Sequence, residues 1–229
     1  HFEDLTDAQS AYVDEYFKRD VYPVVTPMAV DSSRPFPLIR NKTLNIGALI
    51  REKKGKSENS YDFATVQVPG GLPRFVVIPS ENKGDTTIIL LEQIIEKNIS
   101  KLFLNYEVIC AYPYRIMRNA DLTIEEEEAQ DLLIEIQKQI KKRQWGEVIR
   151  LEVEEGIDKR LLKILKKELQ VGEEDIYRIG GPLDLTFLMK VNGMDGFSHL
   201  KYKKYVPAKV PQLNNDEDIF TQIRRHDIV

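Results

Sequence analysis

Short β-rich runs alternate with amphipathic helical patterns along this chain, and this alternation restricts its fold more than any other feature. The apolar pattern predicts helices at residues 7–17, 92–103, 123–143 and 159–169, and β-strands at residues 44–50, 63–68, 74–78, 86–90, 106–117, 147–153 and 177–179. The first three strands are expected to form a meander. Interleaved strands and helices are typical of an α+β or mixed α/β domain, in which helices pack on a mixed β-sheet. We therefore expect one main domain of this class.

Capping and turn signals mark several element ends. Thr6 and Gln9 form a capping box before the first helix, and Thr123 and Glu126 form another before the longest one. Pro182 follows two glycines and stands where the first residue of a further helix belongs. Residues 192–215 show little periodicity and are expected to form a long connector, after which residues 216–229 become helical again.

The charge balance argues against a general attraction for polyanions. The net charge of the 229 residues is -4 at pH 7, although 31% of them are charged, so neither a nucleic acid nor an anionic membrane is required as a partner. Any anion site must therefore be local. The 42% apolar content suffices for a sizeable core, and no apolar run approaches the ~18 residues of a membrane span.

The single cysteine and the N-terminus favour a reducing compartment. Cys110 lies in an apolar strand pattern, where a free cysteine is typically a small buried hydrophobic residue and not a nucleophile. His1 cannot be a natural initiator, so we expect a chain that was cut or processed there, and no basic and apolar signal pattern follows it. A cytoplasmic location is the expectation.

Several familiar catalytic patterns are missing from the sequence. Gly55-Lys56-Ser57 imitates the end of a Walker A loop, but Ile50 stands where that motif requires glycine. The histidines His1, His199 and His226 have no cysteine or histidine at metal-ligand spacing. A P-loop and a zinc site are therefore disfavoured, and anion binding is the chemistry that remains.

Arg118 is the first candidate anion ligand. It lies where a predicted strand gives way to the turn Asn119-Ala120-Asp121, and rim positions of this kind collect binding residues on a rigid sheet. Arg115 would point to the opposite face of an extended strand, so the two arginines cannot both line one site. A structural alternative stays open, in which Asp121 pairs with Arg118 or caps the turn through its own backbone.

Two further segments show weaker anion-binding patterns. Gly180-Gly181-Pro182-Leu183-Asp184 leads glycine-rich backbone into a helix N-terminus. Pro182 removes one N–H donor there and Asp184 adds a negative charge, which favours a cap-and-turn role over a phosphate cradle. Lys201, Lys203 and Lys204 are interleaved with tyrosines. This pattern most favours a solvated lysine face, next a path for a polyanionic chain, and least a nucleic-acid surface.

Four segments carry a resemblance to a known family. They are Thr26-Pro27-Met28-Ala29-Val30-Asp31 running on to Pro35-Phe36-Pro37, then Arg118-Asn119-Ala120-Asp121-Leu122, Gly181-Pro182-Leu183-Asp184-Leu185-Thr186, and Ile219-Phe220-Thr221-Gln222-Ile223-Arg224-Arg225-His226-Asp227-Ile228. Their order and spacing resemble the head, or middle, domain of the bacterial polyphosphate kinase family of the long-chain, phosphohistidine type. On this resemblance, residues 1–20 are a helix from the end of the preceding N-terminal domain, residues 21–213 the head domain, and residues 214–229 the start of the catalytic C-terminal domain.

The resemblance implies an activity whose chemistry lies outside this chain. Family members transfer the terminal phosphate of ATP reversibly to polyphosphate through a phosphohistidine, with Mg²⁺, and the C-terminal domains carry the histidine and the metal ligands. We therefore expect no catalytic residue, cofactor or metal site here, and His226 is not the phosphorylated histidine. The head domain is expected to flank the polyphosphate tunnel and to aid dimerisation. Its candidate polyphosphate ligands are Arg118, Lys201, Lys203 and Lys204, while Asn119, Asp121, Gly181, Pro182 and Asp184 are assigned to turns and helix caps.

The expected partners are the remaining domains of the same polypeptide, polyphosphate, and a second copy of the parent enzyme, with no nucleic acid and no membrane span. A reading of a different class stays open, in which the chain is a free-standing polyanion-binding or scaffolding module with no enzymatic parent. The two readings differ in whether the natural reading frame continues past Val229.

Overall fold

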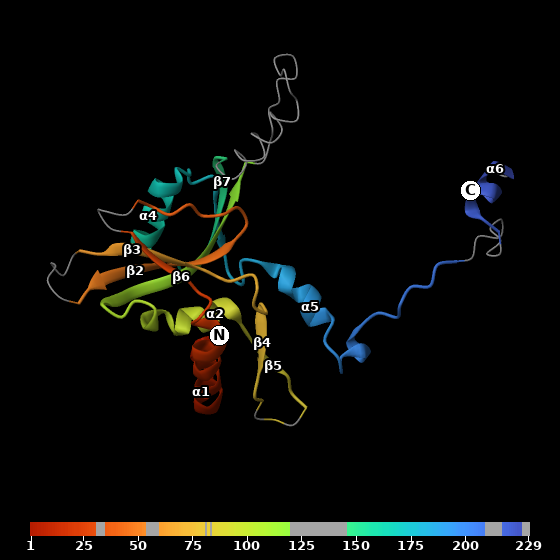
Figure 1. The fold of residues 1–229 in the computed structure, drawn as a ribbon, viewed down its shortest axis with the longest axis horizontal. Coiled ribbons are helices and arrows are strands. Elements are labelled where there is room, and N and C mark those ends of the chain that lie inside the picture. The colour runs from red at the N-terminus through yellow and green to blue at the C-terminus, as the bar shows by residue number, and fades with distance from the viewer. Residues whose placement is uncertain are drawn as a thin grey trace, which may run out of the picture. The chain divides into compact units, whose positions relative to one another are not determined.

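Contacts within the chain divide it into two units. A computed structural model describes residues 1–30, 35–53, 60–80, 82, 84–119, 146–208 and 217–225. The first unit is His1–Leu188 and the second is Met189–Val229. All strands of the described residues belong to the first unit (Figure 1).

A six-stranded mixed sheet is the centre of the first unit. Its strand order is β1-β3-β2-β6-β7-β8, and all neighbouring strands are antiparallel except β7 and β8, which are parallel. The bounds are β1 Pro27–Val30, β2 Leu44–Glu52, β3 Asp62–Gln67, β6 Tyr106–Arg118, β7 Val148–Glu154 and β8 Ile176–Ile179. Helices packed on a mixed sheet confirm the expected fold class.

The predicted meander is wrong at its third strand. β4 (Phe75–Ile78) does not join β3 but pairs with β5 (Thr87–Leu90) in a separate two-stranded antiparallel ribbon. The reason is that β3 already has a partner on each side. It pairs with β2 on one side and with β1 on the other, where Pro27 lies opposite Val66.

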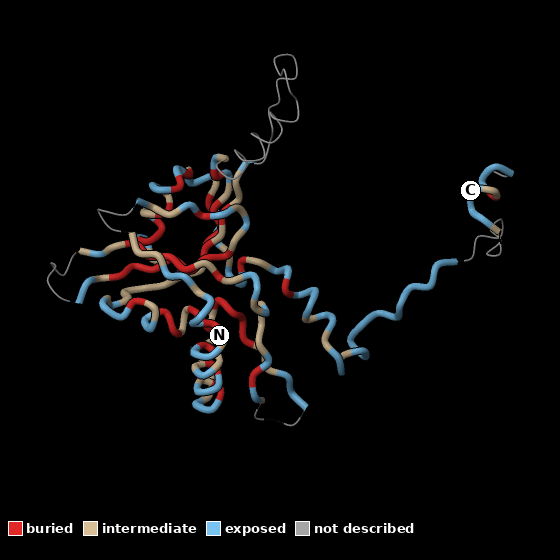
Figure 2. The backbone as a smooth tube through the Cα atoms, viewed as in Figure 1, coloured by how far each residue is buried: buried red, intermediate tan, exposed pale blue. Residues whose placement is uncertain are grey.

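Two apolar cores lie on opposite faces of the sheet (Figures 1 and 2). One face is covered by α1 (Asp7–Tyr16), the π-helical turn η2 (Phe17–Val21) and α2 (Leu91–Lys97), and the other by α4 (Lys159–Leu169). Strand alternation feeds both cores, since Ile46, Ala48 and Ile50 of β2 belong to the α2-side core and Leu49 to the α4-side core.

The helix ends follow local side-chain chemistry. Thr6 Oγ1 accepts a hydrogen bond from the N–H of Gln9 (3.4 Å) and Gln9 Oε1 accepts one from the N–H of Thr6 (3.2 Å), which confirms the predicted capping box. The helix predicted at residues 92–103 is instead α2 followed by the short 3-10 turn η3 (Ile99–Lys101). Buried Asn98 interrupts it, because its side-chain amide donates to the carbonyl of Ile94 (3.1 Å). The helix predicted at residues 123–143 lies outside the described residues.

The helix after the glycine pair begins later than expected. Pro182 is not its first residue, because Asp184 is the N-cap and the helical segment starts with the 3-10 turn η5 (Leu185–Phe187) and continues as α5 (Leu188–Asn192). The second unit contains the 3-10 turn η6 (Ser198–Leu200), an extended stretch and α6 (Ile219–Arg225). A further 3-10 turn, η1 (Phe2–Asp4), precedes α1.

Candidate anion-binding site

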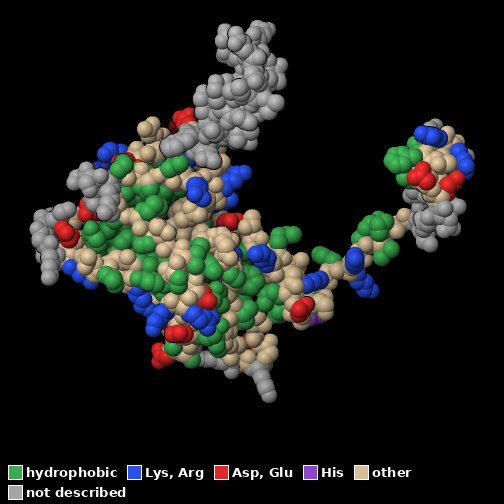
Figure 3. Space-filling view, viewed as in Figure 1, with side chains coloured by type: hydrophobic (Ala, Val, Ile, Leu, Met, Phe, Trp, Pro, Cys, Tyr) green, Lys and Arg blue, Asp and Glu red, His purple; other side chains and the backbone are tan. Residues whose placement is uncertain are grey.

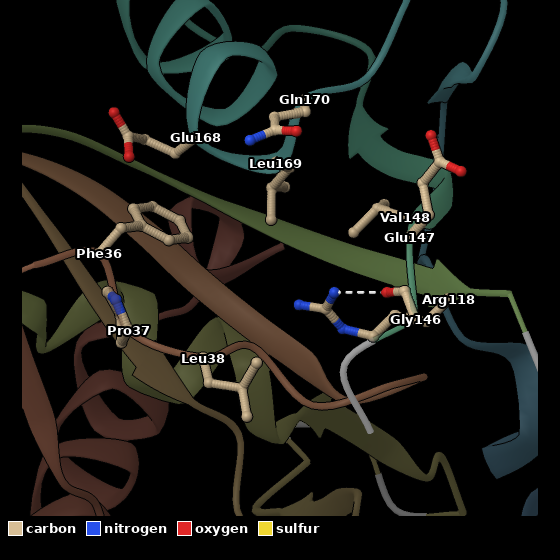
Figure 4. A pocket seen from close by; sticks show the side chains of 10 residues that line it. All are labelled: Phe36, Pro37, Leu38, Arg118, Gly146, Glu147, Val148, Glu168, Leu169 and Gln170. Atoms are coloured by element: carbon tan, nitrogen blue, oxygen red, sulfur yellow. Dashed lines mark hydrogen bonds between the residues drawn. The ribbon is translucent and has the colours of Figure 1, made fainter. Parts of the chain in front are cut away.

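Arg118 lies at the end of β6 and opens onto a pocket. The hollow has a volume of about 710 Å³ and is lined by Phe36, Pro37, Leu38, Arg118, Gly146, Glu147, Val148, Glu168, Leu169 and Gln170. Figure 4 shows the Arg118 guanidinium pointing into the middle of this ring of residues. Its walls come from the segment before β2, from the start of β7 and from the end of α4. The sheet rim therefore presents one arginine to a concave surface.

Backbone carbonyls hold Arg118 in this position. Nε donates to the carbonyl of Ile39 (3.1 Å) and Nη1 to the carbonyl of Gly146 (2.8 Å), while the backbone N–H of Arg118 donates to Asn41 Oδ1 (3.0 Å). A guanidinium has five N–H donors, so these two carbonyls orient it without using all of them. No carboxylate of the described residues forms an ion pair with Arg118, and Asp121, its expected partner, lies outside them.

The electrostatics of the pocket are mixed. Partial burial lowers the pKa of the Arg118 guanidinium below its usual value, although the group stays charged at neutral pH. Glu147 and Glu168 line the same hollow. A single phosphoryl group of a chain can be gripped by the planar fork of an arginine, whereas the two carboxylates weaken the attraction for further phosphates in the same hollow. The pocket is thus suited to a local, directional phosphate contact.

Arg115 is separated from Arg118, as strand alternation predicts. Arg115 lies 3.3 Å from Glu152 in an ion pair and donates from Nε to the carbonyl of Lys42 (3.2 Å). Arg118 instead shares its face with Tyr114 and Ile116, which belong to the α4-side core. The register shift beside Arg118 leaves Ile149 as the extra residue on β7, so β6 keeps its alternation. Asn119, the residue after β6, donates its backbone N–H to the carbonyl of Glu147 (2.8 Å).

The Gly181 turn is tied down by an ion-pair network. Asp184 accepts a hydrogen bond from the N–H of Thr186 (3.1 Å) and lies 3.3 Å from Arg74 in an ion pair. Arg74 also forms a two-pronged pair with Glu92 of α2, at 2.7 and 2.5 Å, and stacks over Phe187 at 5.7 Å. The Asp184 carboxylate occupies the end of the turn where a phosphate would have to bind. Gly181 and Pro182 are exposed and precede this cap.

The lysines of the second unit lie on exposed chain. Lys201 donates to the carbonyl of Met194 (3.2 Å), and Lys203 and Lys204 belong to a stretch without regular secondary structure. Tyr202, between the lysines, and Tyr205, after them, are 103% and 80% exposed. Arg118 belongs to the first unit and these lysines to the second, so they are described separately.

A more cationic hollow, missed by the sequence reasoning, lies beside α4. It has a volume of about 640 Å³ and is lined by Lys159, Leu162, Lys163, Lys166, Lys167, Val171, Glu173 and Arg178. The signal was available in the sequence, because the lysines recur at helical spacing on α4. Only the apolar stripe of that helix was used for prediction.

Other chemistry finds little support in the described residues. No group of three or more His, Cys, Asp or Glu side chains in that part of the chain is close enough to hold a metal ion. None of the helices in the described ranges is both long and apolar enough to cross a membrane. Cys110 is half-buried in β6, and burial raises the pKa of its thiol, which disfavours the reactive thiolate. His199 is exposed in η6, and His226 lies outside the described residues.

Comparison with known proteins identifies the fold and the family. In a solved structure, the crystal structure of polyphosphate kinase from Porphyromonas gingivalis, a similar fold covers 97% of this chain and 31% of that one, with a TM-score of 0.72 and 22% identity. The polyphosphate kinase of Bacillus cereus is 44% identical over 232 residues, which cover 100% of this chain and 33% of the relative. That of Lactiplantibacillus plantarum is 45% identical over 230 residues, covering 99% and 31%.

The chain thus spans about a third of the length of the curated relatives it matches. The model of a family described as the polyphosphate kinase middle domain matches residues 8–191, which include the sheet and both of its cores. The chain therefore belongs to the polyphosphate kinase family, and residues 8–191 correspond to its middle domain.

Proposed function

We propose that this chain is the head domain of an enzyme that reversibly transfers the terminal phosphate of ATP to polyphosphate through a phosphohistidine. In this proposal the domain flanks the path of the polyphosphate and contributes to dimerisation, and the remaining domains of the polypeptide are its first partners. The boundaries expected from the sequence, with a head domain at residues 21–213, belong to the proposal, as does a cytoplasmic location.

The catalytic steps are assigned to other parts of such an enzyme. ATP and Mg²⁺ would supply the phosphoryl group and neutralise its charge. The described residues of this chain do not fit a magnesium site, because they bring no three acidic or histidine side chains together. The contribution of this domain is then to position the polyanion.

The observation that supports a phosphate contact is how the Arg118 side chain is oriented and paired. Its guanidinium is oriented by two carbonyls, faces a pocket, and has no carboxylate partner among the described residues. A cation that serves only to stabilise a fold is normally paired when it is partly buried. An arginine at a sheet rim to which the described residues offer no carboxylate is instead available for an oxyanion.

Titration of the 229-residue chain with polyphosphate at two salt concentrations tests this contact. Arg118→Ala is expected to weaken binding by roughly threefold to tenfold, more than Lys203→Ala does, because a guanidinium forms two parallel hydrogen bonds with a phosphate where a lysine offers a point charge. Arg118→Lys keeps the charge without the fork and should fall in between. Circular dichroism of each variant checks the fold, since the substitutions of Arg118 also remove its hydrogen bonds to Ile39 and Gly146.

Two results would contradict the proposal. Equal affinity of the wild-type chain and a folded Arg118→Ala variant would return Arg118 to a structural role. Incubation with labelled ATP and Mg²⁺ is expected to leave no phosphate on the chain. A stable phosphoprotein with label on His199 or His226 would show that the chemistry is not confined to other domains, and would favour a module with its own activity.

A further inference from the structure

The outer face of α4 carries more positive charge than its packing explains. The helix is anchored in the α4-side core by Leu161, Leu165 and Leu169, which are all buried. Around its other side, Lys159, Lys163, Lys166 and Lys167 line the hollow described above, and Arg178 joins them from β8. Arg178 reaches this face because it lies two residues after Ile176, on the same side of β8, and Ile176 packs in the α4-side core.

The hollow is strongly cationic in an acidic chain. Glu173 is the one acid among the described residues that line it, against five lysine and arginine side chains. Glu173 forms ion pairs with both Lys166 and Arg178. Lys159 and Lys163 have no carboxylate within ion-pair distance in the described part of the chain. The described lining residues have an excess of four positive charges, although Lys167 also pairs with Glu168 just outside the lining at 3.7 Å, whereas the whole chain has a net charge of -4.

This arrangement costs the helix local stability. Lys159 and Lys163 are four residues apart, as are Lys163 and Lys167, and like charges at that spacing repel one another on a helix. Lys159 also occupies the first turn, where the helix dipole favours acidic side chains. A face that was only solvated would be more stable with acids at some of these positions. Binding of an anionic ligand would relieve the repulsion.

We propose that the α4 hollow binds a stretch of polyphosphate, as a contact separate from Arg118. The identity of the ligand rests on the proposed function, and the location of its binding site rests on the cluster of positive charges beside α4. The described residues that line the hollow are aliphatic or charged, and none of them is aromatic, so they offer no platform on which nucleic-acid bases could stack. Lysines act as point charges that follow an anionic backbone without fixing its orientation. The 11 residues of α4 extend over roughly 16 Å, which accommodates several phosphate groups.

The first test removes two charges from the face. Binding of fluorescent polyphosphate is measured by anisotropy over a series of salt concentrations for the wild-type chain, for Lys163→Gln/Lys167→Gln and for the control Lys18→Gln/Lys190→Gln. The control positions are exposed, and the described residues offer them no ion pair. The α4 variant should bind roughly tenfold more weakly at low salt. The slope of log K against log[salt] should become about one to two units less steep, because binding with fewer phosphate contacts releases fewer counterions. The control should change affinity less than twofold.

A second test adds charge instead of removing it. Glu173→Gln frees Lys166 and Arg178 from their carboxylate and should tighten binding severalfold. Glu174→Gln makes the same charge change one residue away, outside the lining of the hollow, and should have a smaller effect. Thermal unfolding of the lysine variant should occur at the same or a higher temperature than in wild type, since repulsion is removed, so weaker binding could not be ascribed to misfolding.

The outcomes separate this inference from the function on which it rests. If the α4 variant binds like its control while Arg118→Ala weakens binding, the inference is overturned and the proposed function stands. If the wild-type chain binds no polyphosphate, both are overturned. If it binds single-stranded DNA of equal charge more tightly, with the same loss in the α4 variant, the face is a nucleic-acid surface and the polyphosphate assignment is wrong.

Discussion

Glu96 shows how strongly one side chain can be perturbed by its place in this fold. It lies on α2, partly buried against the sheet, and burial raises its pKa to about 8, with Glu154, Glu92 and Glu3 adding repulsion. Burial also raises the pKa of Glu154, with Glu3 adding to the effect. At neutral pH the folded chain therefore favours a protonated Glu96.

The pKa shift predicts a loss of stability as pH rises. The unfolded carboxyl has its ordinary pKa of 4.5, so the unfolded state releases the proton first, and the free energy of unfolding falls as pH increases from about 4.5 to about 8. Glu96→Gln removes this dependence. It should stabilise the chain by roughly 1–3 kcal/mol at pH 8.5, after allowance for solvent screening, and change it little at pH 4.5. Urea unfolding at both pH values measures the difference.

Glu15→Gln is the matched control, because Glu15 is an exposed carboxylate on neighbouring α1. It should leave the pH dependence of stability unchanged. A Glu96→Gln chain that was no more stable than wild type at pH 8.5 would show that Glu96 reaches water and keeps an ordinary pKa.

At the scale of elements, the ion-pair network of Arg74 connects parts that hydrogen-bonded strands do not. It links the start of the β4–β5 ribbon to α2 through Glu92 and to the Gly181 turn through Asp184. The side chains of Arg74 and Glu92 are only 15% and 6% exposed. Removing one partner of a nearly buried ion pair of this kind destabilises the fold, whereas replacing both partners by apolar groups changes its stability little.

The network yields a double-mutant prediction. Arg74→Met leaves the Glu92 carboxylate buried without its cation and should lower the free energy of unfolding by about 3 kcal/mol. Arg74→Met/Glu92→Leu should recover most of that loss, since no buried charge of this pair remains. Denaturant unfolding of wild type, both single variants and the double variant gives the coupling energy. Additive effects of the two substitutions would mean that the pair contributes nothing as a pair.

The sequence predicted elements better than their partners. α4 was predicted correctly because its leucines recur at helical spacing. The structure adds an N-cap that the prediction did not use, since Asp158 accepts a hydrogen bond from the N–H of Arg160 (2.8 Å). β4 was predicted as a strand but in the wrong sheet, since alternation of apolar residues identifies a strand and carries no information on which edge is free. Asn98 shortened α2 through a side-chain bond that apolar periodicity does not register.

The candidate sites were also predictable only as far as they depend on local sequence and not on tertiary contacts. Arg118 was found because strand-end positions can be located from the sequence, while its two carbonyl partners, from residues 39 and 146, depend on the tertiary fold. The cationic hollow needed Arg178 of β8 to be brought beside α4, which follows only from the parallel pairing of β7 with β8. Figure 3 shows Lys and Arg side chains interspersed with hydrophobic and acidic ones on the visible face of the first unit, in line with anion sites that are local.

At the scale of the whole molecule, the two cores of the first unit share one sheet. β2 contributes alternate residues to both, so loss of packing on one face exposes a strand that supports the other. The 229-residue chain should therefore unfold in a single transition of its first unit, with coincident curves from far-UV circular dichroism and calorimetry. A broad transition with dye binding and early loss of side-chain signals would show instead that neighbouring domains are needed to complete the cores.

The two edges of the sheet bear on how copies of the chain can associate. The outer strands β1 and β8 have four residues each, whereas central β6 has 13, and β1 begins with a proline that has no N–H to donate. Short edges interrupted by proline or carrying a charged residue such as Arg178 resist the edge-to-edge pairing through which sheets aggregate. A dimer built by these domains would then avoid one continuous intermolecular sheet across β1 or β8 and would join through other surfaces.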